Sequence, residues 1–130
     1  MQNKDLTEEE KKVIHDGGTE APFSGKYWDY NDDGFYHCKN CGAKLFDSST
    51  KMDSSKVPMG LRGWPAFDNA LPDAIEKRED RSLGMVREEI VCKNCGAHLG
   101  HLFGDDESKT GQHFCVNSCS LDFEHKKEEK

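Results

Sequence analysis

Residues 38–43 read Cys-Lys-Asn-Cys-Gly-Ala, and residues 92–97 repeat the same six residues. In each copy two cysteines, separated by two residues, precede a glycine, and this spacing lets one tight turn direct both sulfurs toward a single point. Two such turns supply the four sulfur ligands of a closed tetrahedral zinc site. We therefore predict that one structural zinc ion is bound by Cys38, Cys41, Cys92 and Cys95.

Other uses of these cysteines are conceivable, because a lone Cys-x-x-Cys also suits a redox pair and six cysteines also suit three disulfides in a secreted protein. The identical flanks of the two copies favour zinc. Residues 1–12 are polar and acidic and have no apolar core of the kind found in a signal peptide. We therefore expect a cytoplasmic protein with reduced thiols.

The composition predicts a single domain over residues 1–130, with residues 1–5 and 125–130 frayed. Only 34% of the residues are hydrophobic and 33% are charged, so the core is small and a metal cross-link would help to stabilise it. The net charge of −7 argues against binding to nucleic acid or to anionic membranes, and no apolar run is long enough to span a bilayer. We expect a monomer.

The pattern along the chain predicts a mainly β fold with one short N-terminal helix. Thr7 and Glu10 form a capping box at the start of the helix, and Gly17-Gly18 end it. Short strands bounded by turn residues indicate a small sandwich or barrel, and we place them at residues 35–37, 44–46, 85–91, 113–116 and 121–123. We expect a long loop over residues 47–63 and a helical turn near residues 74–77.

Two cysteines, Cys115 and Cys119, lie outside the repeat, and the region before Cys115 is rich in histidine. His98 and His101 directly follow the second Cys-x-x-Cys, and His113 lies two residues before Cys115. Histidines can lower the pKa of a nearby cysteine and can donate protons, which is typical of a catalytic site. Surface histidines near a small buried thiol explain these residues equally well, so spacing alone leaves both interpretations open.

Longer motifs carry a resemblance to a known family. Residues 92–103 read CKNCGAHLGHLF, followed by Thr110-Gly111 and by FCVNS at residues 114–118, while GTEAPFSG and GWPAF occur upstream at residues 18–25 and 63–67. In this order they resemble the methionine sulfoxide reductase B family over roughly residues 5–124. The resemblance implies a zinc-bearing pair of antiparallel sheets, the β-tent, and reduction of methionine-R-sulfoxide, either free or in oxidised proteins.

The resemblance also assigns roles to individual residues. Cys115 would be the nucleophile that becomes a sulfenic acid, which a second thiol and a thioredoxin-like reductant then reduce. His98, His101 and Asn117 would hold the sulfoxide oxygen or a water and assist proton transfer. Trp64 would pack against the S-methyl group, although without the resemblance it is equally well a core aromatic. A non-catalytic zinc β-tent binding module is the alternative function, and a zinc-ribbon nucleic-acid binder is disfavoured by the charge.

Three features depart from that family. No cysteine lies just before Gly63-Trp64, where many relatives carry the resolving thiol, and Cys119 replaces the usual alanine. Residues four apart on a strand are separated by about 13 Å, too far for a disulfide, so Cys119 can act as the resolving thiol only if the chain turns. Otherwise Cys119 is a small buried residue, or an external thiol reduces the sulfenic acid directly. His113 stands in place of arginine, so we expect weaker or more pH-dependent activation of Cys115.

Overall fold

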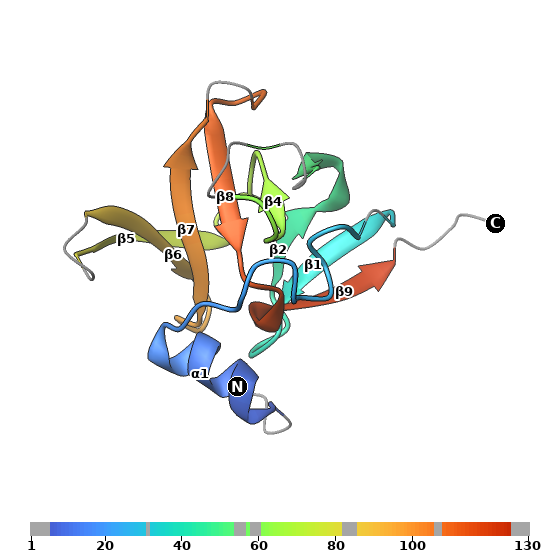
Figure 1. The fold of residues 1–130 in the computed structure, drawn as a ribbon. Helices are drawn as coiled ribbons and strands as arrows, with labels where there is room; N and C mark the ends of the chain where they lie inside the picture. Colours follow the sequence, from blue (N-terminus) through green and yellow to red (C-terminus); the bar gives the residue numbers. More distant parts are fainter. Residues whose placement is uncertain are drawn as a thin grey trace.

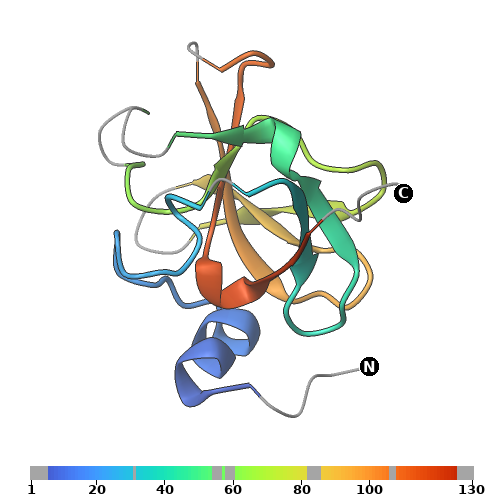
Figure 2. The same cartoon turned by 90° about the vertical axis from the view of Figure 1, so that its right-hand side faces the viewer.

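The computed structural model describes residues 6–30, 32–53, 57, 61–81, 86–105 and 108–125. Two antiparallel sheets lie at an angle to one another, with one helix below them (Figures 1 and 2). The smaller sheet has the order β2-β1-β9, with strands Lys44–Asp47, Gly34–Cys38 and Leu121–His125. The larger sheet has the order β3-β4-β8-β7-β6-β5, with strands Lys51–Met52, Ala66–Phe67, Gln112–Val116, His98–Gly104, Arg87–Cys92 and Ile75–Asp80. The predicted mainly β class is confirmed.

The two copies of the repeated hexapeptide form equivalent turns, one in each sheet. The first connects β1 to β2, and the second connects β6 to β7. Cys38 N–H donates to the Ala43 carbonyl at 2.8 Å, and Cys92 N–H donates to the Ala97 carbonyl at 2.9 Å. Gly42 and Gly96 have φ of 85° and 80°, a left-handed conformation that glycine adopts without steric cost. The repeated sequence therefore specifies a repeated backbone.

The core lies between the two sheets and is largely aromatic. Tyr36 and Phe46 project from the smaller sheet, and Phe67 and Phe114 project from the larger one, all fully or almost fully buried. The rings of Phe46 and Phe67 stack with centroids 4.2 Å apart, while Tyr36 meets Phe67 edge-on at 5.0 Å. Each such buried side chain contributes about 1.5–3 kcal/mol, so a few large rings compensate for the low hydrophobic content.

Helix α1, Glu8–Asp16, begins at the predicted capping box. Glu10 N–H donates to the Thr7 hydroxyl, the Thr7 N–H donates to the Glu10 carboxylate, and Gly17 ends the helix in a left-handed conformation. The helix packs against β7 and the short 3₁₀ helix η3, Ser118–Ser120, at the lower end of the sheets in Figure 1. None of the helices in the described part of the chain has the length and apolar character needed to cross a membrane.

Two sequence predictions were wrong in detail. Residues 74–77 were expected to form a helical turn, but β5 runs from Ile75 to Asp80 and pairs with β6 along its whole length. β5 is an edge strand, and its residues 76–79 are exposed and charged. The alternation of apolar and polar residues that usually indicates a strand is therefore missing from its sequence. The expected loop over residues 47–63 contains the 3₁₀ helix η1, Ser48–Thr50, and β3, which pairs with β4.

Other parts of these predictions fall outside the described residues. Residues 54–56 and 58–60 of the expected loop lie there, as do residues 1–5 and 126–130 of the expected frayed ends. His125 was included in the frayed C-terminal end, but it is the last residue of β9. His125 is paired with Gly34 of β1, so the smaller sheet extends to this residue, and its imidazole Nε2 lies 2.9 Å from the Asp32 carboxylate.

Candidate active site and metal site

One row of residues across the larger sheet places Cys115 beside a histidine. Cys115 on β8 is directly opposite His101 on β7, which in turn is opposite Glu89 on β6. On the other side of Cys115, the opposing residue is Ala66 on β4. Directly opposed residues share a face of the sheet and have Cβ atoms about 4.5–5.5 Å apart. The register therefore brings the thiol and the imidazole together.

A β-bulge brings the second histidine to the same face. Residues three apart on a regular strand point to opposite faces, which would separate His98 from His101. The pairing shifts by one residue here, because Ile90 is opposite Gly100 while Val91 is opposite His98, which leaves Leu99 as the extra residue. The two imidazole centroids consequently lie 5.6 Å apart. The proximity of His98 and His101 that the sequence suggested is a product of this bulge.

A cavity of about 100 Å³ lies in front of this row of residues. Four of the five predicted catalytic and substrate-binding residues line the cavity, namely Cys115, His101, Asn117 and Trp64. His98 is buried and does not line the cavity, and its Nε2 atom has no hydrogen-bond partner among the described residues. Trp64 is partly exposed, whereas Phe67 and Phe114 are buried core residues.

Two carboxylates that sequence reasoning missed hold the two imidazoles. Glu89 Oε2 lies 2.7 Å from Nδ1 of His98, and Asp80 Oδ2 lies 2.7 Å from Nε2 of His101. Arg87 pairs with Asp80 at 3.3 Å and also lines the cavity. A carboxylate on one ring nitrogen fixes the ring and its tautomer. Only the β5–β6–β7 register reveals these pairs, and the sequence gives no signal for it.

The thiol of Cys115 is protonated at neutral pH in the substrate-free site. Burial, with a smaller contribution from the nearby Glu20 carboxylate, raises the pKa of Cys115 to about 12. Burial also lowers the pKa of His101, against the opposing effect of the Asp80 carboxylate. The expectation that neighbouring histidines lower the pKa of this thiol is therefore wrong for the free site, because a neutral imidazole offers no charge to offset desolvation.

Asn117 and Trp64 are both attached to the same segment of chain. The Asn117 side chain accepts a hydrogen bond from Glu20 N–H at 3.0 Å and donates one to the Leu99 carbonyl at 3.1 Å. The Trp64 indole N–H donates to the Glu20 carbonyl at 2.9 Å. Both side chains thus have fixed orientations where they line the cavity.

Cys119 occupies a different environment from Cys115. The chain does turn after Asn117, because residues 118–120 form η3. Cys119, however, lines a separate cavity of about 340 Å³ beneath α1, together with Glu9, Glu10 and Glu20. Burial raises the pKa of Cys119 to about 12, and the surrounding carboxylates act in the same direction. In this conformation the two thiols open onto different cavities.

His113 is completely buried two residues before Cys115. Its Nδ1 atom lies 3.1 Å from the carboxylate of Asp105, which is also buried. Burial lowers the pKa of His113 despite that carboxylate, so the imidazole is neutral at pH 7. A fixed positive charge near Cys115 is therefore not supplied by this residue.

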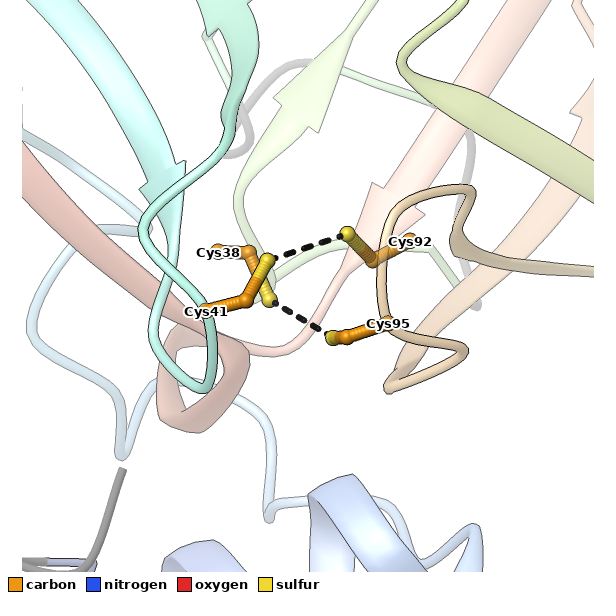
Figure 3. Close-up of side chains that lie close together, drawn as sticks. All are labelled: Cys38, Cys41, Cys92 and Cys95. Carbon is orange, nitrogen blue, oxygen red and sulfur yellow. Dashed lines mark hydrogen bonds between the residues drawn. The ribbon is translucent and has the colours of Figure 1, made fainter. Parts of the chain in front are cut away.

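The four cysteines of the repeat lie together, as predicted, and are positioned to bind a metal. Their sulfurs lie within 4.8 Å of one another, with Cys38 to Cys95 at 3.7 Å and Cys41 to Cys92 at 3.6 Å (Figure 3). A tetrahedral ion with bonds of about 2.3 Å to sulfur requires sulfurs roughly 3.8 Å apart, so the donor set fits. Amides from the same turns also approach the sulfurs, since Asn94 donates to Cys41 and Asn40 donates to Cys95.

A sequence model of the SelR domain matches residues 6–125. The chain belongs to the SelR domain family. Among SelR relatives, "Peptide methionine sulfoxide reductase MsrB" of Variovorax paradoxus (strain S110) is 54% identical over 116 residues, which cover 88% of this chain and 81% of that protein. The protein of the same name from Synechococcus sp. (strain RCC307) is 48% identical over 122 residues, covering 93% of this chain and 85% of that protein.

Proposed function

We propose that this SelR domain protein is a peptide-methionine (R)-S-oxide reductase that uses Cys115 as its nucleophile. The observation that carries the proposal is the position of Cys115, opposite His101 and in the same cavity as Trp64 and Asn117. The cavity is small, partly apolar and closed on one side by an indole, which suits a methylated sulfur. The membership of the SelR family supports the same activity.

The reaction requires a thiolate, a proton donor and a place for the sulfoxide oxygen. We propose that the ring nitrogen of His101 not bound by Asp80 takes the proton of Cys115 and passes it to the sulfoxide oxygen. The thiolate of Cys115 attacks the sulfoxide sulfur to form an S–S bond, and the S–O bond breaks as the protonated oxygen leaves as hydroxide. Hydroxide then attacks the sulfur of Cys115 and the S–S bond breaks, so methionine leaves reduced with the electron pair of that bond and Cys115 is oxidised to a sulfenic acid.

Each remaining polar group has a role that follows from its position. Asn117, whose side chain is held by Glu20 and Leu99, orients the oxygen or a bound water, and His98, held by Glu89, packs beside His101 outside the cavity lining. Arg87 lines the cavity and adds positive charge where negative charge develops on oxygen. Trp64 packs against the S-methyl group and excludes water from that side.

The sulfenic acid is then reduced by a thiol, and two routes fit this chain. In one, Cys119 forms a disulfide with Cys115 after η3 moves, and a thioredoxin-like dithiol regenerates both cysteines. In the other, the external thiol reduces Cys115 directly. The separate cavities of the two cysteines favour the direct route, because a disulfide needs Cα atoms within about 7 Å and correctly directed side chains.

We also propose that the protein binds one zinc ion through Cys38, Cys41, Cys92 and Cys95. Four sulfur ligands leave no open coordination position, so the metal is structural and supplies a rigid turn immediately before His98. The catalytic steps take place on the protein side chains alone.

The deciding experiment measures reduction of methionine R-sulfoxide with dithiothreitol as the reductant. We expect turnover by the natural protein, none by Cys115→Ser, and near-normal turnover by Cys119→Ser, which serves as the matched control. Activity in Cys115→Ser would contradict the assignment of the nucleophile. No turnover by the natural protein would favour the non-catalytic binding module.

The same variants separate the two routes of regeneration. If Cys119 is the resolving thiol, Cys119→Ser loses activity with thioredoxin while it keeps activity with dithiothreitol. If the external thiol acts directly, Cys119→Ser is active with both reductants. Mass spectrometry of the oxidised protein after one turnover checks the result, since only the first route forms a Cys115–Cys119 disulfide.

A further inference from the structure

Glu20 is a buried charged residue to which no catalytic step has been assigned. It lies in the irregular segment between α1 and Pro22, and only 4% of its surface is exposed. Burying a carboxylate costs several kcal/mol unless its interactions compensate, so an acidic residue at this position calls for a reason. Its surroundings supply one.

Three separate groups are hydrogen-bonded to this one residue, and two of them line the substrate cavity. Its main-chain N–H donates to the Asn117 side chain, and its main-chain carbonyl accepts from the Trp64 indole. Its carboxylate Oε1 accepts from Cys119 N–H at 2.9 Å. Glu20 therefore connects the two side chains that line the substrate cavity with the first turn after β8.

The carboxylate is confined on its other side by Gly25. A Cβ atom at this glycine would lie 2.4 Å from Glu20 Oε2 and 2.3 Å from the Ser118 hydroxyl, so only glycine leaves room there. Oε2 itself has no hydrogen-bond partner among the described residues. The side chain thus has one strong attachment, the charge-assisted bond from Cys119 N–H, and a tight packing neighbour.

We infer that Glu20 is a positioning residue for the reductase proposed above. Its carboxylate fixes the segment against η3, and the fixed segment holds Trp64 and Asn117 at the spacing that the sulfoxide requires. The bonds to Trp64 and Asn117 come from the main chain, so any residue other than proline at position 20 could make them. The side chain determines whether the main chain stays where those bonds are formed, and misplacement by about 1 Å can reduce a rate by about 10²-fold.

The test compares Glu20→Ala, which removes the attachment, with Glu20→Gln, which keeps an acceptor of the same size for Cys119 N–H. Glu88→Ala is the matched control, because Glu88 is an exposed glutamate on β6. The first measurement is kcat and KM for methionine sulfoxide with dithiothreitol. The second is the indole N–H signal of Trp64 in ¹⁵N-labelled protein, assigned with Trp28→Phe, since the chain has two tryptophans.

We expect Glu20→Ala to raise KM about tenfold or more and to shift or broaden the Trp64 indole signal. Glu20→Gln should restore both toward the natural values, and Glu88→Ala should leave both unchanged. Natural KM and an unchanged indole signal in Glu20→Ala would overturn the inference. The inference would also be overturned if Glu20→Gln were as defective as Glu20→Ala. The negative charge of residue 20, and not its hydrogen bond to Cys119 N–H, would then be what matters.

A second variant guards against loss of folding in Glu20→Ala. Gly25→Ala keeps the carboxylate but displaces it, and we expect the same change in the Trp64 signal. An unchanged signal in Gly25→Ala would contradict the inference. The indole signal needs no turnover, so it tests the role of Glu20 even if the natural protein fails to reduce methionine sulfoxide.

Discussion

At the scale of single residues, the site combines a protonated thiol with two imidazoles held by carboxylates. In the proposed mechanism Cys115 is the residue to be ionised, and His101, opposite it on β7, is the neutral base. Asp80 fixes the ring of His101 and stabilises it once it has gained a proton. We expect this arrangement to keep Cys115 unreactive until a substrate enters, and the reactivity of the thiol can be measured.

The first prediction concerns the reactivity of Cys115 toward iodoacetamide. Only the thiolate reacts, so a pKa of about 12 implies a rate that rises about tenfold per pH unit from pH 7 to pH 10 without a plateau. Mass spectrometry of the labelled Cys115 peptide in Cys119→Ser gives this rate. A plateau below pH 9 would show that the thiol is activated in the free protein.

The same measurement tests the consequence of a histidine at position 113. An arginine paired with Asp105 stays charged at every pH, whereas His113 is neutral. We expect His113→Arg to move the reactivity profile of Cys115 to lower pH. A profile that His113→Arg leaves unchanged would contradict the idea that the charge at this position controls the thiol.

The third prediction concerns Asp80 and the orientation of His101. Asp80→Asn removes the carboxylate but keeps the shape, so His101 can adopt the wrong tautomer and loses its charge partner. We expect kcat to fall by about 10²-fold with a small change in KM. The exposed Glu79, next to it on β5, gives the control Glu79→Gln, which should keep full activity. Equal effects of the two variants would exclude the proposed role.

At the scale of elements, two features of the larger sheet determine the geometry of the site. One is the bulge in β7, and the other is the close contact between β7 and β8. Local sequence predicted the positions of β1, β2 and β8 because turn residues bound each of them. It could not predict β5, whose exposed residues are charged, or the bulge, which exists only relative to β6. Glu89 and Asp80 were missed for the same reason, since pairing register is a property of two strands and not of one.

Gly100 offers a test of the β7–β8 contact. A Cβ atom there would lie 1.9 Å from the carbonyl oxygen of Cys115, so the two strands would have to separate. We expect Gly100→Ala to lower the free energy of unfolding by about 1–3 kcal/mol or more and to abolish activity. Gly104→Ala is the control on the same strand, because nothing lies within 4 Å of a Cβ atom there. Urea unfolding followed by circular dichroism distinguishes them.

At the scale of the whole molecule, the metal site joins two sheets whose hydrophobic core is small. The sequence repeat was sufficient to predict which four cysteines lie together, because each turn is encoded locally. The relative placement of the sheets was not encoded in this way. It depends on the aromatic contacts of Tyr36, Phe46 and Phe67, which residues distant in sequence make only after folding.

Removal of the metal should therefore destabilise the entire domain. We expect about one zinc ion per chain by elemental analysis, and cooperative unfolding when a strong chelator removes it. Cys38→Ser should bind little zinc and should unfold at a lower temperature, whereas Cys115→Ser should match the natural protein in zinc content and melting temperature. A metal-free chain with the natural melting temperature would show that the core alone suffices.

The placement of the two equivalent turns also affects the order of folding. Each turn can form by itself, but the chain between Cys41 and Cys92 contains the strands β3, β4 and β5 and nearly all of β6 of the larger sheet. A metal ion captured early by all four sulfurs closes that long loop in the unfolded chain, and the closure removes on the order of 4 kcal/mol of chain entropy before any core contact exists. Zinc present during folding should thus increase the rate at which the two sheets pack against each other. Zinc added after folding can only stabilise the packed arrangement.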